Sequence, residues 1–439
     1  GSDGIYTAAF REVGIIQAQS TEEMMDMVFA LSGQGLNPDH FGRKALVLCT
    51  GGGSGIQALD AIERSPLSPA ALSEESIARI KAIVPEFAGV TSHMIDVTPQ
   101  MLMDPSYLAH FGDLLQIIEE DPGVDVTLFV QASSAPSAPA VCRSIENHRK
   151  TAKKPIILTW WALPDNAREL LKAANIYVFP SQGRAINFLS ALAAYCELKD
   201  SVRERTAPPH QKPELSWPMP DLSQGPVVLT EDKVSPWLAS YEIGNASAKF
   251  AKDEDEAAVF AAEIGYPVVL KVINEGLAHR SKYGLVALDV KDEGMLREKC
   301  ALLRDNANKN LGLETIEGFW VQMFRPNGLE LIVGGFKSEP FGRVMVCGVG
   351  GYLAEYFKPV YRLLPIDEEE AGKMVAELPF IRRYPEGVDL EALKEALLNF
   401  SNLMLDCPWD AFELELNPVK VLKEGEGVVA VDALAIVKK

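Results

Sequence analysis

The sequence has little positive charge and no closely spaced cysteines. Its 42 Lys and Arg residues stand against 61 Asp and Glu residues, so the formal net charge is −19 at pH 7. A field of that sign repels nucleic acid and anionic membranes, and we exclude both as main partners. The six cysteines form no Cys-x-x-Cys pair, and several lie in apolar runs such as residues 45–49 and 344–349. We therefore expect reduced core cysteines in a cytoplasmic protein.

Long apolar runs are absent as well. No apolar segment of the sequence is long enough to span a membrane, and we expect no signal peptide. The first residues, Gly1-Ser2-Asp3, do not include Met and lead directly into an amphipathic helical pattern. We expect either a tag remnant or a cut through a larger protein at this point. The length of the chain predicts about three domains.

The first half of the chain combines a helical start with alternating strands and helices. Residues 1–40 predict helices and resemble the C-terminal remnant of a preceding domain. Residues 41–205 alternate apolar strands, the first at residues 45–49, with helices. Strands separated by helices are typical of a parallel, doubly wound sheet, so we predict an α/β domain here.

The second half begins with a linker. Residues 206–224 hold five prolines among mostly polar residues, which predicts an extended connection, and we expect His210 within it to be solvated. Residues 225–439 then form another large unit. We divide this unit into a first lobe over residues 225–318 and a second lobe over residues 319–439.

A glycine-rich turn follows the first strand of the α/β domain. Residues 50–55, Thr-Gly-Gly-Gly-Ser-Gly, precede a helix, so their backbone amides can approach an anion at the helix N-terminus. Gly51, Gly52 and Gly53 are therefore candidates for binding a phosphate or a phosphorylated side chain, and a nucleotide is the less favoured ligand. The alternative is a turn that only packs the helix on the strand.

Residues 267–290 combine a strand, a cationic loop and a second strand. Lys271 at the end of the first strand is suited to bind a triphosphate. His279 in the loop can act as a nucleophile and carry phosphoryl, because its neutral ring keeps a lone pair near pH 7. The alternative is a Lys and a His on the solvent side of an edge hairpin.

Oxygen ligands gather near the C-terminus. Glu413, Glu415 and Asn417 alternate and so share one face of a predicted strand, while Asp432 follows an apolar run that we expect to lie beside it. Ligands without His or Cys suit Mg²⁺ held between protein and phosphates. The alternative is a half-buried edge strand with its polar face in water.

A Lys after a strand, a glycine-rich loop, a Glu/Asn pair and a late Asp, in that order, resemble an ATP-grasp domain. More narrowly, the chain is similar to the C-terminal part of the nucleoside-diphosphate-forming (ADP-forming) acyl-CoA synthetases, which are related to succinyl-CoA synthetase. Over residues 41–205 the resemblance implies a flavodoxin-like ligase domain, and over residues 225–439 a two-lobed ATP-grasp domain. The motifs that carry it are residues 47–63, 121–130, 264–272, 277–284 (LAHRSKYG), 328–335, 348–365 and 413–419 (ELELNPV).

The resemblance implies a site for Mg²⁺ and ATP or ADP in the second large unit. Lys271 would bind the nucleotide phosphates and His279 would carry the phosphoryl group. The Gly51–Gly53 turn would face a phosphohistidine of the preceding domain. The other implied site residues are Glu330, Gly348, Gly350, Gly351 and Arg362 around the nucleotide, and Glu415, Asn417 and Asp432 as Mg²⁺ ligands.

Some residues differ from the family pattern. The family usually has His-Lys-Ser-Asp at the phosphoryl carrier, whereas Arg280 and Lys282 stand here, and Leu285 replaces a glycine. Residues 322–324, Gln-Met-Phe, offer no acidic partner for a ribose. We expect the CoA-binding domain and the first phosphohistidine of the family to lie outside this sequence, and CoA to be bound by that absent part.

Together these features predict the ATP-binding and phosphoryl-transfer portion of an ADP-forming acyl-CoA synthetase. Such enzymes convert a carboxylate, ATP and CoA to acyl-CoA, ADP and phosphate through phosphohistidine and acyl phosphate. We expect this portion to be inactive alone and to form a homo- or hetero-oligomer with a CoA-binding half. Two alternatives stay open: an ATP-grasp ligase that joins a carboxylate to an amine, and a non-catalytic nucleotide sensor with a decayed site.

Overall fold

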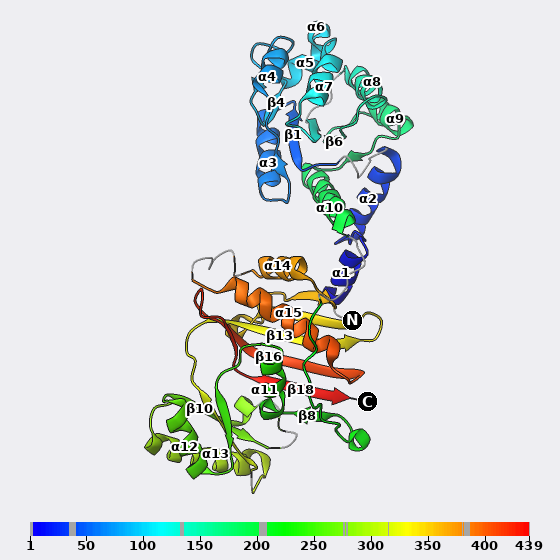
Figure 1. The fold of residues 1–439 in the computed structure, drawn as a ribbon. Helices are drawn as coiled ribbons and strands as arrows, with labels where there is room; N and C mark the ends of the chain where they lie inside the picture. Colours follow the sequence, from blue (N-terminus) through cyan, green and yellow to red (C-terminus); the bar gives the residue numbers. More distant parts are fainter. Residues whose placement is uncertain are drawn as a thin grey trace. The chain divides into compact units, whose positions relative to one another are not determined.

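The computed structural model contains two compact units (Figure 1). One comprises Phe10–Val202, here called the N-terminal unit, and the other comprises Gly1–Ala9 with Arg203–Lys439, here called the C-terminal unit. The structure describes residues 3–34, 41–131, 136–201, 209–274, 277, 280–314, 316–379, 381 and 387–438.

A parallel sheet forms the centre of the N-terminal unit. Its parallel strands lie in the order β4-β1-β5-β6-β7, which is the flavodoxin-like order 2-1-3-4-5. The short strand β2 also pairs with β1 in parallel, and β3 pairs with β4 in antiparallel fashion. The predicted doubly wound α/β fold is therefore confirmed. The bounds are β1 (Lys44–Cys49), β2 (Ser68–Pro69), β3 (Gly89–Val90), β4 (Met94–Asp96), β5 (Val126–Gln131), β6 (Ile156–Trp160) and β7 (Val178–Phe179).

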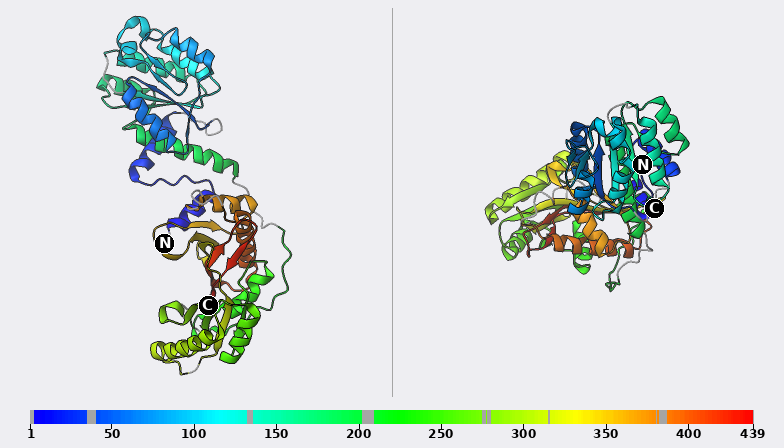
Figure 2. Two further views of the ribbon diagram at one scale, coloured as in Figure 1. Left: turned by 90° about the vertical axis from the view of Figure 1, so that its left-hand side faces the viewer. Right: turned by 90° about the horizontal axis from the view of Figure 1, so that it is seen from above.

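Helices cover both faces of this sheet (Figure 2). Successive side chains of β1 point to opposite faces, so each face of the sheet has its own apolar core. Leu46 and Leu48 belong to one apolar core, whereas Ala45, Val47 and Cys49 belong to the other. The first core includes α4 (Glu74–Lys81), α5 (Thr98–Met103), α7 (Phe111–Glu120), α8 (Ala138–Arg149) and α9 (Asp165–Ala173), with α6 (Pro105–Leu108) beside α5. The second core includes α2 (Thr21–Gln34), α3 (Gly52–Glu63) and α10 (Gln182–Ser201).

The N-terminal helices pack on different units. Tyr6 of α1 (Asp3–Glu12) meets Phe341 edge-on at a ring distance of 5.1 Å. Asp26 of α2 is buried and accepts hydrogen bonds from Arg184 of α10, at 2.6 Å from Nε and 2.7 Å from Nη2. This ion pair attaches α2 to the core of the N-terminal unit.

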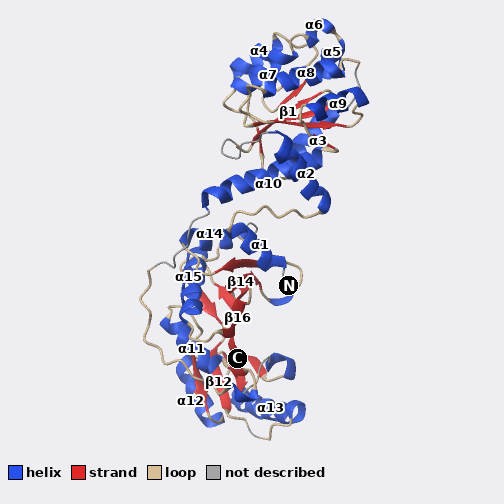
Figure 3. Ribbon diagram, turned by 90° about the vertical axis from the view of Figure 1, so that its right-hand side faces the viewer, coloured by secondary structure: helices blue, strands red, loops and turns tan. Residues whose placement is uncertain are grey.

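Two antiparallel sheets build the C-terminal unit (Figure 3). The smaller sheet has the order β11-β10-β12-β9, and α12 and α13 pack on it. The larger sheet has the order β15-β14-β13-β16-β18-β8, with β17 paired to β16. The smaller lobe contains β9 (Ala248–Ala251), α12 (Glu254–Ile264), β10 (Val268–Ile273), β11 (Val286–Val290), α13 (Glu293–Leu311) and β12 (Gly318–Met323).

The two sheets do not follow the predicted lobe boundary at residue 318. Strand β12 pairs with β10 in the smaller sheet, whereas β8 and α11 pack with the larger sheet although they precede the smaller lobe in sequence. The chain thus crosses between the lobes twice. The larger lobe contains β8 (Val227–Leu229), α11 (Glu231–Ser240), β13 (Leu329–Ser338), β14 (Gly342–Val349), β15 (Val360–Leu363), α14 (Glu368–Glu377), α15 (Leu390–Asp406), β16 (Ala411–Val421), β17 (Val428–Ala430) and β18 (Ala433–Lys438).

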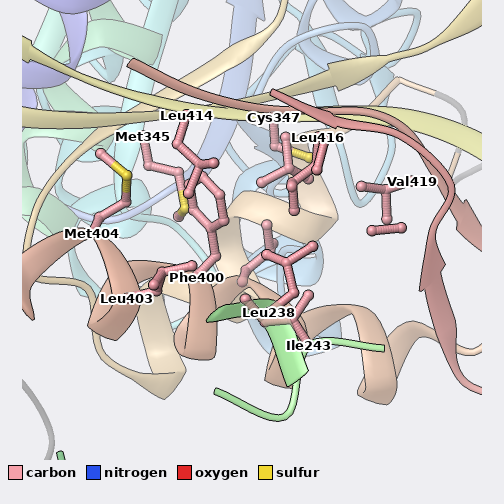
Figure 4. Close-up of a cluster of buried hydrophobic side chains, with 14 of the residues drawn as sticks. Leu238, Ile243, Met345, Cys347, Phe400, Leu403, Met404, Leu414, Leu416 and Val419 are labelled. Atoms are coloured by element: carbon pink, nitrogen blue, oxygen red, sulfur yellow. The ribbon is translucent and has the colours of Figure 1, made fainter. Parts of the chain in front are cut away.

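One face of the larger sheet is apolar and the other is polar. Leu414 and Leu416 of β16 point toward Phe400 on α15, as Figure 4 shows, and all three side chains are buried. Glu415 and Asn417 alternate with them on the opposite, exposed face. Burial of the apolar face therefore fixes which side of β16 presents the candidate metal ligands.

The linker is attached to the larger lobe. Asp406 at the end of α15 accepts a hydrogen bond from Tyr241 at 2.7 Å and lies 2.8 Å from Nε2 of His210. Trp217 packs against Trp237 and Trp409, with ring distances of 5.0 and 5.5 Å. His210 is exposed, as expected, but its ring also pairs with a carboxylate of the lobe.

Replacing Asp406 with Asn should loosen this attachment. Burial alone would raise the pKa of Asp406, but hydrogen bonds from His210 and Tyr241 outweigh it and leave the pKa below its usual value. Loss of charge-assisted hydrogen bonds should lower the free energy of unfolding by about 1.5–3 kcal/mol. Thermal unfolding followed by tryptophan fluorescence measures this change. The exposed Asp410→Asn should shift stability by less than about 0.5 kcal/mol, and an equal shift in both variants would contradict the prediction.

Candidate active site

Three buried charged side chains, Glu231, Lys271 and Arg280, form a cluster with the partly exposed Asp432 between β10, α11 and the start of β18. Lys271 Nζ lies 2.7 Å from Oε2 of Glu231 and 3.7 Å from Oδ1 of Asp432. Arg280 Nη2 contacts the same two oxygens, at 3.1 and 2.5 Å. Lys271 also donates to the carbonyl oxygen of Val431 at 2.6 Å. Two cations thus share two carboxylates, and the cluster carries no net charge when both carboxylates are ionised.

The cluster excludes the alternative for Lys271. Strand β10 lies inside the smaller sheet, between β11 and β12, and Lys271 is only 3% exposed. A lysine on the solvent side of an edge hairpin would instead be accessible to water. Burying an ammonium group requires charged partners, which Glu231 and Asp432 supply.

Sequence reasoning missed Glu231 and Gln322. Glu231 is the first residue of α11 and is 4% exposed, and its Oε1 accepts a hydrogen bond from Nε2 of Gln322 at 2.7 Å. An acid in the first turn of a helix favours the helix dipole and gives no sign of function by itself. Gln322 attracted notice only as a missing acid, although its amide serves to hold the buried carboxylate.

The two carboxylates of the cluster have opposite pKa shifts. Burial raises the pKa of Glu231 to about 7, against the opposing attraction of Lys271. Burial acts in the same sense on Asp432, but Lys271 and Arg280 outweigh it and hold the pKa of Asp432 below its usual value. Asp432 therefore stays ionised at neutral pH, as a metal ligand must.

Stability of the C-terminal unit should fall between pH 4.5 and pH 7. The folded-state pKa of Glu231, about 7, lies above its ordinary 4.5. The folded state therefore binds this proton more tightly, and its stabilising effect, complete below pH 4.5, is lost as the pH rises to 7. The loss has an upper bound of about 3 kcal/mol. Thermal unfolding across this range should show the slope, and Glu231→Gln should flatten it; an unchanged slope in that variant would contradict the assignment.

A cavity of about 520 Å³ lies beside the cluster. Glu415 and Asn417 line it from β16, and Asn417 Nδ2 donates to Oε1 of Glu415 at 2.9 Å. Strand β16 pairs with β13 and β18, so it is an interior strand rather than the edge strand of the alternative interpretation. The lining residues are Leu277, Arg280, Ser281, Lys282, Glu330, Gly351, Glu415, Asn417, Pro418, Asp432, Ala433 and Leu434.

The glycine loop after β14 borders this cavity. The N–H of Gly350 donates to the backbone oxygen of Glu330 at 2.8 Å. Gly351 has a φ of +64°, and a Cβ there would come within 2.8 Å of Oε2 of Glu330, so the turn requires glycine. Gly348 lies within β14, opposite Ile332 of β13. Gly351 and Glu330 also line a second cavity of about 810 Å³.

Other predicted site residues lie elsewhere. The Arg362 guanidinium contacts Glu370 at 3.1 Å and Glu377 at 3.0 Å, and it does not line either cavity. The turn at Gly51, Gly52 and Gly53 begins α3 in the N-terminal unit. His279 lies outside the residues that the structure describes, although its neighbours Leu277 and Arg280 both line the smaller cavity.

The donor set of the cavity fits Mg²⁺. Two carboxylates, Glu415 and Asp432, and the amide of Asn417 line the cavity, and their oxygens are of the kind that Mg²⁺ prefers. Within the described residues no group of three or more His, Cys, Asp or Glu side chains could hold a metal ion. A site with few protein ligands suits Mg²⁺, which usually keeps waters and takes oxygens from substrate phosphates.

No helix in the described part of the chain is long and apolar enough to cross a membrane.

A family model described as an ATP-grasp domain matches residues 221–437. The chain is 35% identical over 226 residues to the β subunit of the ADP-forming acetate–CoA ligase II of Pyrococcus furiosus. That alignment covers 49% of this chain and 94% of the subunit.

Longer relatives match nearly the whole chain. The ADP-forming acetate–CoA ligase I of Archaeoglobus fulgidus is 31% identical over 441 residues, which cover 98% of this chain and 62% of that ligase. The ADP-forming 4-hydroxybutyrate–CoA ligase of Nitrosopumilus maritimus is 26% identical, again with 98% and 62% coverage. The chain thus spans less than two thirds of the length of these relatives. With its ATP-grasp domain and its similarity to the Pyrococcus β subunit, the chain belongs to the family of ADP-forming acyl-CoA ligases.

Proposed function

We propose that this chain binds Mg²⁺ with ATP or ADP and transfers phosphoryl as part of an ADP-forming acyl-CoA ligase. The observation that carries the proposal is the cavity beside Lys271, where cations from one lobe face oxygen ligands from the other. Arg280 and Lys282 lie on one side, and Glu415 and Asn417 on the other. A polyphosphate with a divalent metal supplies the charges that both walls require.

Each group has a role in this proposal. Lys271 Nζ lies 3.7 Å from Oδ1 of Asp432, which lines the cavity, and Lys282 lines the cavity itself, so both would place positive charge near the phosphates. Glu330 lines both cavities, where its carboxylate can accept from ribose hydroxyls. Mg²⁺ at Glu415, Asn417 and Asp432 would neutralise charge on the phosphate oxygens.

The transfer itself would form a phosphohistidine. A neutral ring nitrogen of His279 attacks the γ-phosphorus of ATP, the bond from phosphorus to the bridging oxygen breaks, and ADP leaves with that electron pair. In the complete ligase the phosphoryl group passes to a carboxylate to give an acyl phosphate. The thiolate of CoA then displaces phosphate, so that carboxylate, ATP and CoA yield acyl-CoA, ADP and phosphate.

Labelling with γ-³²P-ATP and Mg²⁺ tests the transfer. We expect a covalent label that is stable in base and labile in acid, as a phosphoramidate is, and that is lost in His279→Ala. His110→Ala, which changes an exposed histidine of the N-terminal unit, should keep the label. A label that survives in His279→Ala would contradict the role of this histidine.

The same experiment separates the alternatives. Nucleotide binding without any label would favour a sensor. Formation of ADP from an acid and an amine, without a labelled intermediate, would favour a carboxylate–amine ligase.

A further inference from the structure

Arg280, which lines the cavity, has a buried hydrogen-bond donor that no described residue uses. Its side chain is 6% exposed, and its Nη2 contacts both Glu231 and Asp432. Its Nη1, by contrast, is buried and has no hydrogen-bond partner in the part of the chain that the structure describes. A buried guanidinium N–H without a partner lowers the stability of the fold. A hydrogen bond from this N–H to an acceptor in the cavity would therefore be favourable.

Asp432, the second carboxylate that pairs with Arg280, is also a candidate metal ligand. Oδ1 of Asp432 accepts from Arg280 and from the backbone N–H of Ala433 at 3.0 Å, and Lys271 lies 3.7 Å away. A divalent cation bound to this carboxylate would bring two positive charges next to the guanidinium. Asp432 therefore cannot hold both partners equally well.

We propose that Arg280 is a phosphate-binding residue whose release depends on metal: a divalent cation at Asp432 displaces the guanidinium, which stays paired with Glu231 and binds a nucleotide phosphate through its free N–H. The proposal deepens the proposed function and rests on nucleotide binding in this cavity. A guanidinium suits this role because its several donors, arranged in a fixed fork, can bind a protein carboxylate and a phosphate at once.

Exchange of Arg280 between Asp432 and a phosphate would also change what holds the turn that Arg280 begins. Arg280 begins the short turn Arg280–Tyr283, which follows His279 directly and also brings Ser281 and Lys282 to the cavity. Without metal, the ion pair with Asp432 fixes the turn against β18. With metal and nucleotide, the same side chain would fix the turn against the phosphates, so the loop responds to both ligands together.

A linkage experiment tests the proposal by binding alone. Affinity for a non-hydrolysable ATP analogue is measured by calorimetry, with Mg²⁺ and with a chelator, for the wild type and for Arg280→Gln. We expect Arg280→Gln to weaken binding by about 10-fold or more with Mg²⁺, and by much less with the chelator, because Asp432 then retains the guanidinium in the wild type. Arg280→Lys keeps the charge and the fold but lacks the spare N–H, so it should show the same metal-dependent loss to a smaller degree.

A matched control and two outcomes decide the result. Arg297→Gln removes an exposed arginine of the same lobe, paired with Asp255 and Glu293, and should leave both affinities unchanged. If the wild type binds the analogue and both Arg280 variants lose the same factor with and without Mg²⁺, the inference fails and the proposed function stands. If the wild type binds the analogue under neither condition, both fail.

Discussion

Replacing Lys271 with Met is expected to lower both the stability of the C-terminal unit and the rate of histidine phosphorylation. The ammonium group is one of two cations that neutralise the buried carboxylate of Glu231 and the partly exposed carboxylate of Asp432. Breaking a buried ion pair typically costs 3–5 kcal/mol, and because Arg280 remains we expect about 3 kcal/mol. For a unit of this size that corresponds to a fall of roughly 6–12 °C in melting temperature. Loss of a positioned cation beside the phosphates should slow labelling by about 10²–10³-fold.

A double variant separates the two effects of Lys271. In Lys271→Met with Glu231→Gln, one charge of each sign is removed, so most of the lost stability should return while labelling stays slow. Four of the six tryptophans lie in the C-terminal unit, so intrinsic fluorescence mainly reports unfolding of this unit. Normal labelling in the stable double variant would show that Lys271 is structural only.

The sequence allowed the prediction of features that local geometry determines. The alternation of residues 413–417 predicts a polar face with Glu415 and Asn417, and burial of Leu414 and Leu416 under α15 makes that face the exposed one. The apolar strand before residues 50–55 likewise predicts a buried strand leading to a helix, which the structure contains as β1 and α3. Both predictions depend only on residues close together in the chain.

The sequence could not predict which charged residues pair across long separations. Glu231 contacts Lys271 and Arg280, which follow it by 40 and 49 residues, and this contact joins α11, which packs on the larger sheet, to the smaller lobe that follows it in sequence. Arg362 was expected near the nucleotide from its place in a motif, but its guanidinium pairs with Glu370 and Glu377 of α14. The predicted lobe boundary failed for the same reason, because antiparallel pairing with the distant strand β10 places β12 in the smaller sheet.

Replacing Glu415 with Gln should remove a metal ligand while leaving the fold unchanged. Glu415 lies on the exposed face of β16 and accepts a hydrogen bond from the amide of Asn417, which the carbonyl of a Gln side chain can still accept. Charge stabilisation by a metal is worth several kcal/mol, so loss of one carboxylate ligand should slow labelling by about 10²-fold at limiting Mg²⁺. Raising the Mg²⁺ concentration should restore part of the rate, because the remaining ligands Asn417 and Asp432 still bind the ion more weakly.

The chain offers a close control for this measurement. Glu413 lies on the same face of the same strand, two residues earlier, but it pairs with Lys438 and does not line the cavity. Glu413→Gln should therefore leave the Mg²⁺ dependence of labelling unchanged, and both variants should keep their stability within about 0.5 kcal/mol of the wild type. If the two variants had the same Mg²⁺ dependence, the polar face of β16 would be a solvated surface and the metal would have to be held elsewhere. A shift confined to Glu415→Gln would instead separate the metal ligands from the other acids of the strand, because of the two carboxylates only that of Glu415 lines the cavity.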